Sequence, residues 1–295
     1  RVEKLTKEEN GEVVTKTKAL VLHKVGDVAR LQTDSMIISS FINVTVNGFV
    51  DNYNMIMNSA ANVVNIVFNS VLSSFGNLIA TESKDRQYEL FKVYRFAASW
   101  IYGFAAVGFA ILLTPFITLW VGAERTLAFS VIGCILIDFY FKGERIVLSN
   151  FKTAAGVFEQ DKYLALIQGV VNLVISIVLV VRIGLVGVYI GTIVSGLIAN
   201  VTKPIIIYHV ILDRKAGEYF RDSMKYCLLL VIQYGIFYGI SGIIMKEITI
   251  LTFLVMFVII CVVFNGIFLM VFRKAGEFQY LVTIVRRKID ERKVR

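Results

Sequence analysis

The sequence predicts an all-α, polytopic membrane protein with eight transmembrane helices. Of its 295 residues, 57% are hydrophobic, with a mean hydropathy of +0.70, whereas a soluble domain is about 45–50% apolar. Long apolar runs recur along the chain, as expected of helices that each need about 20 residues to cross the hydrocarbon layer. These runs show no period of two, which excludes the short alternating strands of a membrane β-barrel.

Eight apolar segments can be placed along the chain. They cover about 17–48, 52–80, 93–121, 127–150, 162–182, 184–211, 225–245 and 248–272. Several are longer than the bilayer requires, so we expect those helices to tilt or to extend beyond it.

The connections between these segments alternate in charge. Those on one side of the membrane contain 24 Lys and Arg residues and those on the other side contain three. The positive-inside rule therefore places both termini in the cytoplasm, and an even number of spans agrees. We therefore attribute the net charge of +9 to the orientation of the chain in the membrane and to contact with anionic lipids. No nucleic-acid partner is expected.

The first segment carries four charged residues on one helical face. Lys24, Asp27, Arg30 and Asp34 follow at spacings of three, three and four and can pair along the helix. Asp34 lies about 24 Å beyond Lys18 at about 1.5 Å per residue. An ionisable group at that depth faces a protein interior or a water-filled cavity and marks a candidate functional site. The alternative is a salt-bridge stripe that only orders the bundle.

The fourth segment repeats this pattern. Asp138, Lys142 and Arg145 lie at i, i+4 and i+7, with Glu144 beside them. Four charges within eight residues are not expected of a helix that faces lipid. The fifth segment adds a polar stripe formed by Gln168, Asn172 and Ser176.

The second segment holds a ladder of asparagines. Asn54, Asn58, Asn62, Asn65 and Asn69 follow at spacings of four, four, three and four, on one face of a helix. Such amides bond across a helix–helix interface, or they line an aqueous path where sugar hydroxyls need donors and acceptors. The second interpretation is favoured, because five amides exceed what one interface requires and two charged stripes accompany them.

The C-terminal residues predict a basic amphipathic helix on the cytoplasmic surface. Its apolar face comprises Phe278, Leu281, Val282, Val285 and Ile289, with Arg286, Arg287 and Lys288 nearby. The alternative is a disordered basic tail.

Motifs of soluble enzymes are missing from the sequence. There is no P-loop, GxSxG or HExxH, and no loop is long enough for a catalytic domain. Cys134, Cys227 and Cys261 lie in apolar runs without a CxxC or Cys/His cluster, so they are expected to be packing residues rather than metal ligands. We expect a non-enzyme without a cofactor or metal centre.

Four stretches resemble a known family. They are TKALVLHKVGDVARLQTDSMIISSF, NYNMIMNSAANVVNIVFNSVLSSFGNLIATE, FKTAAGVFEQDKY and GLVGVYIGT. The chain resembles the polysaccharide biosynthesis proteins of the O-antigen and capsule flippase type. These belong to the superfamily that includes the multidrug and toxin extrusion (MATE) antiporters. The resemblance extends over nearly the whole chain as a pattern of long helices.

The resemblance implies the second half of a MATE-like two-lobe transporter. Family members have two six-helix lobes and two further helices. Here 17–211 would be the second lobe and 225–272 the further helices, with cytoplasmic segments at 1–16, 212–224 and 273–295. The first lobe would be missing, and the absent initiator Met agrees with a fragment of a longer protein.

The implied activity is the movement of an undecaprenyl-pyrophosphate-linked oligosaccharide across the bacterial plasma membrane by alternating access. The cargo would be a repeat unit of a polysaccharide such as lipopolysaccharide O-antigen or capsule. Phosphate contacts would come from Arg145, Lys142, Arg30 and Lys24. Contacts to sugar hydroxyls would come from Asn58, Asn62, Asn65 and Asn69.

Asp34 and Asp138 are candidates for coupling to H⁺ or Na⁺. Asp34 resembles, by its position in the first helix of the lobe, an acidic residue of many relatives. Arg30, one turn before it, would hold the carboxylate ionised, which argues against a proton carrier.

Two alternatives stay open. A cation antiporter of the same fold would have a cavity of carboxylates and aromatic side chains. A membrane-embedded glycosyltransferase or acyltransferase would need an acid–base site, for which the sequence offers no motif.

Overall fold

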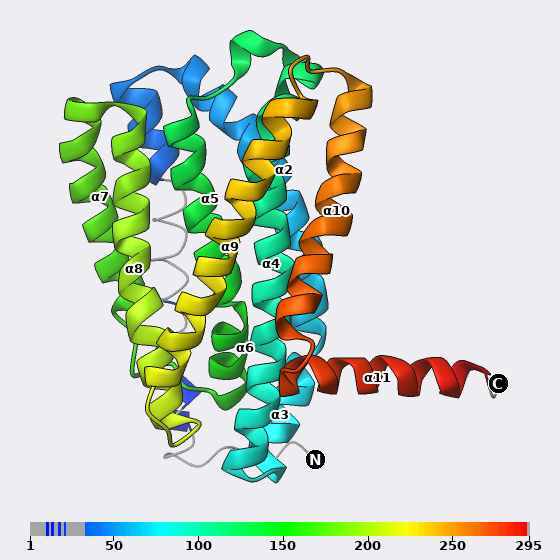
Figure 1. Ribbon diagram of the computed structural model, residues 1–295. Helices are drawn as coiled ribbons and strands as arrows, with labels where there is room; N and C mark the ends of the chain where they lie inside the picture. The colour runs from blue at the N-terminus through cyan, green and yellow to red at the C-terminus, as the bar shows by residue number, and fades with distance from the viewer. Residues whose placement is uncertain (1–9, 12, 15–16, 19–20, 22–32, 294–295) are drawn as a thin grey trace.

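The computed structural model describes residues 10–11, 13–14, 17–18, 21 and 33–293 (Figure 1). Over these ranges the chain forms helices and their connections and contains no strand, which confirms the all-α class. A helical segment at 33–41 is followed by eleven helical elements. These are α2 (Val44–Ser70), α3 (Leu72–Thr81), α4 (Lys84–Val121), η1 (Ala123–Arg125), α5 (Phe129–Glu144), α6 (Ile146–Ala155), α7 (Leu164–Ile183), α8 (Leu185–Val210), α9 (Gly217–Ile244), α10 (Ile250–Phe272) and α11 (Gly276–Lys293).

Six helical stretches within this part of the chain are long and apolar enough to cross a membrane. They are Val44–Thr81, Lys84–Val121, Leu164–Ile183, Leu185–Val210, Gly217–Ile244 and Ile250–Phe272. The chain is therefore a multi-pass helical membrane protein. The finer count of eight spans stays a prediction, because the first predicted segment lies mostly outside the described residues.

Two predicted boundaries are wrong. The segment predicted at 17–48 ends earlier, because extended Asn43 caps the next helix and accepts a hydrogen bond from the Thr45 amide at 2.7 Å. The segment predicted at 127–150 is two helices of 16 and 10 residues, α5 and α6, which meet at Arg145.

The helices form an elongated bundle in which α7 and α8 lie side by side at one edge and α10 lies at the other (Figure 1). Small residues of α8 pack against α7. A Cβ atom on Gly191 would collide with Ser176, and one on Gly187 would collide with the backbone of Leu179. These two glycines therefore allow the close approach of the helices.

Aromatic packing joins the remaining helices. Phe151 of α6 lies between Phe75 of α3 and Phe91 of α4, with ring centroids 4.5 and 5.1 Å away. Trp100 of α4 stacks on Phe268 of α10 at 4.9 Å and donates to the Asn265 side chain at 2.9 Å. The helix α10, although it lies at the edge, is thus fixed to α4 by both apolar and polar contacts.

The helix α11 begins near the foot of α10 and projects sideways away from the bundle (Figure 1). Phe278 and Leu281 pack against the core. Arg86 of α4 donates to the Tyr280 hydroxyl at 3.2 Å, and Lys92 lies 3.8 Å from Glu277. The helix predicted for the C-terminal residues is confirmed and the disordered alternative is wrong. The side chains of Val285 and Ile289 lie outside the described part.

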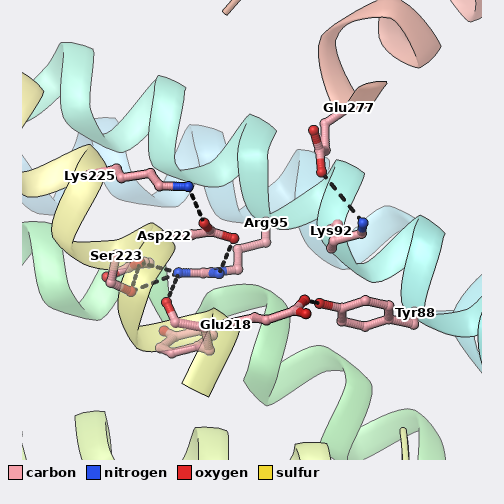
Figure 2. A network of polar contacts seen from close by, with 10 residues as sticks. Tyr88, Lys92, Arg95, Glu218, Asp222, Ser223, Lys225 and Glu277 are labelled. Carbon is pink, nitrogen blue, oxygen red and sulfur yellow. Dashed lines mark hydrogen bonds and ion pairs between the residues drawn. The ribbon is translucent and has the colours of Figure 1, made fainter. Parts of the chain in front are cut away.

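A buried ionic network ties α9 to α4 and α5 (Figure 2). The Arg95 guanidinium donates to Glu144 at 3.1 Å, to the Tyr219 carbonyl at 2.7 Å and to Ser223 at 2.7 Å. Ser223 also donates to Glu144, and Asp222 lies 3.9 Å from the guanidinium. The Arg95 side chain is 3% exposed and that of Glu144 is 5% exposed. Removing one charge would leave the other buried without compensation.

Replacing Arg95 with Ala is therefore expected to lower the free energy of unfolding by about 3–5 kcal/mol. The measurement is the denaturant midpoint of the purified protein in detergent. The matched control is Arg86→Ala on the same helix, whose ion pair with Glu89 joins side chains 42% and 62% exposed and contributes little. Equal midpoints for the two variants would contradict the structural role of the network.

Candidate functional site

A cavity of about 280 Å³ lies between the 33–41 segment, α2, α5 and α8. Apolar side chains such as Ile38 and Phe139 form part of its wall. Its charged and amide lining residues are Asp34, Asp51, Asp138, Lys142, Asn54 and Asn58. A polar cavity within apolar membrane helices costs free energy, which makes it the candidate functional site.

Asp34 is held by side chains from α7 and α8. The Asn172 amide donates to one carboxylate oxygen at 2.9 Å, and the Thr192 hydroxyl donates to the other at 2.7 Å. Ser176 donates to the Asn172 side-chain oxygen at 3.1 Å and lies 3.0 Å from the Val188 carbonyl. Two residues of the polar stripe predicted for 162–182 thus belong to the surroundings of Asp34. Asn172 donates to the carboxylate directly, and Ser176 is linked to it through Asn172.

The donor set around Asp34 suits a hard cation. The carboxylate, two hydroxyls and a backbone carbonyl offer oxygen atoms, as Na⁺ sites of transporters do, and the Asn172 amide would offer its oxygen to a cation beside Asp34 only after turning around. Asn172 turns its nitrogen toward Asp34 and its oxygen toward Ser176 and Thr192. The carboxylate could also take a proton, because the Thr192 hydroxyl can donate to the Val188 carbonyl instead.

Asp138 and Lys142 form the second charged group of the cavity. The Lys142 ammonium lies 2.5 Å from the Asp138 carboxylate, one helical turn away on α5. Asp138 is buried, whereas the Lys142 side chain is 46% exposed. Among the described residues that line the cavity, three carboxylates thus face one ammonium. Lys24, Asp27 and Arg30 lie outside the described residues.

Arg145 is separated from this cavity. It is buried where α5 ends and α6 begins, and it donates to the Gly196 carbonyl of α8 at 3.1 Å. The prediction placed Asp138, Lys142 and Arg145 on one face of a continuous helix. Because α5 ends at Glu144, Arg145 no longer belongs to that face. Lys142 and Arg145 therefore do not form one cationic surface.

The asparagine ladder divides among three environments. Asn58, together with Asn54, lines the cavity. Asn65 accepts a hydrogen bond from the buried Tyr102 hydroxyl of α4 at 2.6 Å. Asn62 and Asn69 are exposed and do not line the cavity. Each four-residue step advances about 40° around the helix, so Asn62 lies about 80° from Asn54. Asn65 thus bonds across a helix–helix interface, as the first interpretation expects, and the second interpretation stays a prediction for Asn54 and Asn58. Asn62 and Asn69 fit neither interpretation.

Sequence reasoning did not assign Asp51, Tyr189 or Thr192 to the site, although all three line the cavity. Asp51 stands between two predicted segments and resembles a loop residue. Thr192 follows Gly191 within an apolar helix, where one hydroxyl is an ordinary residue. No signal in the sequence could distinguish them, because their place in the cavity depends on how α2 and α8 pack with elements far away in the chain.

Comparisons of the chain with known protein families, with curated proteins and with solved structures find no match. The interpretation of the cavity therefore depends on its own residues and on the resemblance of the sequence.

Proposed function

We propose that this chain is the second lobe, with two further helices, of a flippase. The flippase would carry an undecaprenyl-pyrophosphate-linked oligosaccharide to the outer leaflet of the bacterial plasma membrane. The observation that supports the proposal is the polar cavity between apolar helices. Asn54 and Asn58 offer donors and acceptors to sugar hydroxyls, and half-exposed Lys142 offers a cation to a phosphate.

Such a cavity separates the two halves of an amphiphilic cargo. The glycan and the pyrophosphate would use the polar lining, while the polyprenyl tail stays in the bilayer. Alternating access requires two bodies that move against each other around a central site. The proposal therefore includes a first lobe as partner, eight spans in this chain and cytoplasmic termini.

We further propose that the Asp34 cluster takes the coupling cation, either H⁺ or Na⁺. A sodium ion would be held by Asp34, Asn172, Ser176, Thr192 and the Val188 carbonyl. A bound cation neutralises the carboxylate. Because the cluster joins the 33–41 segment to α7 and α8, its protonation or ligation would change how strongly these helices are tied together.

A second candidate function is a cation antiporter of the same fold. It is favoured by the three carboxylates that face one ammonium, together with Tyr189 and Phe139 in the same lining. The two functions differ in the cargo, and the same cavity would serve either one.

Lys142→Gln is expected to lower surface polysaccharide strongly in cells of the source bacterium that lack the native gene. A charge-assisted hydrogen bond contributes about 1.5–3 kcal/mol, which corresponds to an affinity loss of about tenfold or more. Surface polysaccharide is measured by immunoblot, and the amount of protein in the membrane is measured in parallel.

A matched pair of amides makes the test specific for the cavity. Asn58→Leu should lower polysaccharide, whereas Asn62→Leu, one turn away and outside the cavity, should not. Normal polysaccharide for Lys142→Gln and Asn58→Leu at normal protein levels would contradict the proposed cargo. Ethidium efflux above that of vector cells, lost in Asp138→Asn, would then support the antiporter.

Sodium chloride should raise the thermal unfolding midpoint of the purified protein relative to choline chloride at equal ionic strength. At about ten times the dissociation constant the gain is about 1.4 kcal/mol. Asp34→Asn should abolish the shift, whereas Asp51→Asn, which lines the same cavity but does not bond the cluster, should retain it. The absence of a shift in the unaltered protein would eliminate Na⁺ and leave H⁺ as the proposed ion.

A further inference from the structure

A second cavity, of about 360 Å³, lies outside the proposed transport site. It is formed by the first turns of α4 and α9 and by the connection before α9. Its lining residues are Tyr88, Arg214, Lys215, Gly217, Glu218 and Arg221. None of them lines the cavity around Asp34.

The wall of this cavity is fixed by specific contacts. The Arg214 guanidinium lies 4.3 Å above the centre of the Tyr88 ring and 2.5 Å from the Asp85 carboxylate. The connection itself is held by Lys84, whose ammonium donates to the Ile211 carbonyl at 2.7 Å. The Arg214 amide also donates to the Tyr208 carbonyl at 2.8 Å. These contacts give the cavity a defined shape before any ligand arrives.

The charges that line this cavity are mostly positive and partly unused. Three cations face one carboxylate, Glu218, which already accepts a hydrogen bond from the Tyr88 hydroxyl (Figure 2). Lys215 and Arg221 make no ion pair or hydrogen bond within the part of the chain that the structure describes. The cavity therefore offers two cations that pair with none of the described residues, beside an immobilised guanidinium. Together their N–H groups suit an anion with several oxygens.

The depth of the cavity indicates the source of that anion. The apolar runs of the two helices begin at Phe96 in α4 and at Cys227 in α9. Tyr88 and Arg221 precede these positions by about 12 and 9 Å at about 1.5 Å per residue. The two polar headgroup layers together add about 10–15 Å to the hydrocarbon core, which is about 5–7 Å on each side. The cavity therefore lies at the water-facing edge of one headgroup layer, where side chains as long as Lys and Arg reach the lipid phosphates.

We propose that this cavity binds the phosphate headgroup of an anionic membrane lipid. Basic pockets between membrane helices recognise such headgroups, and Arg offers the planar donors that fit phosphate oxygens. The proposal does not depend on the cargo of the transporter. Free phosphate has the same oxygen chemistry, so the experiment separates the two sources.

The test measures lipid adducts of the full chain in detergent by native mass spectrometry. The probes are palmitoyl-oleoyl phosphatidylglycerol, palmitoyl-oleoyl phosphatidylcholine and inorganic phosphate. We expect tighter binding of phosphatidylglycerol than of phosphatidylcholine, with no competition from equimolar inorganic phosphate. In the double variant Lys215→Gln/Arg221→Gln the affinity for phosphatidylglycerol should fall about tenfold or more, since each basic residue near a membrane surface contributes about 1 kcal/mol.

The control removes the same charge elsewhere. Arg273→Gln/Lys274→Gln lies in the connection between α10 and α11 and takes away two exposed cations. It should leave phosphatidylglycerol binding unchanged. An equal loss of affinity in both double variants would overturn the proposal in favour of non-specific attraction. Equal affinity for the two lipids would overturn it as well, and competition by inorganic phosphate would assign the cavity to a free anion. Unaltered unfolding midpoints establish that both variants are folded.

Discussion

Charged side chains inside an apolar bundle need partners on neighbouring helices, and the rest of this structure depends on that constraint. A membrane helix has no water with which to satisfy a buried carboxylate or guanidinium. Asp34 accepts hydrogen bonds from α7 and α8. One terminal nitrogen of Arg95 donates to groups of α5 and α9, whereas its Nε has no hydrogen-bond partner among the described residues. The glycines of α8 allow the first arrangement, because they bring α7 and α8 close enough to present both partners to one carboxylate.

The Arg95 network and the centre around Asp34 differ in how far they are closed off from solvent. The Arg95 network is nearly closed to solvent and its groups bond one another, so it holds α9 in place. The centre around Asp34, Asp138 and Lys142 borders a cavity, and under the proposed function its hydrogen bonds would be exchanged for bonds to an ion or a cargo. Transport by moving lobes requires this combination, since a rigid body is needed to carry a site whose ligands can change.

The sequence predicted the features that are local in the chain. Apolar runs of 20 residues identify α4, α7, α8, α9 and α10, because hydropathy acts within one helix. Contacts between residues far apart in the chain were not predictable: Asn172 and Thr192, which donate to Asp34, lie 138 and 158 positions from it. Asn172 was recognised as polar, but its bond to Asp34 was not, and Thr192 was not singled out at all. Arg145 was misplaced for a related reason, because helical periodicity applies only while the helix continues. The asparagine ladder was predicted as one face, although only its first part meets the cavity.

The central claim is that the cavity is an aqueous site at membrane depth. Its most direct test is cysteine labelling in native membranes with a membrane-impermeant maleimide, after the three free cysteines are replaced by Ala. The account predicts that Asn58→Cys reacts, because Asn58 lines the cavity. It predicts that Val262→Cys does not react, because Val262 is 66% exposed in the middle of the apolar helix α10 and faces lipid. Labelling of Asn58→Cys as slow as that of Val262→Cys would contradict the claim.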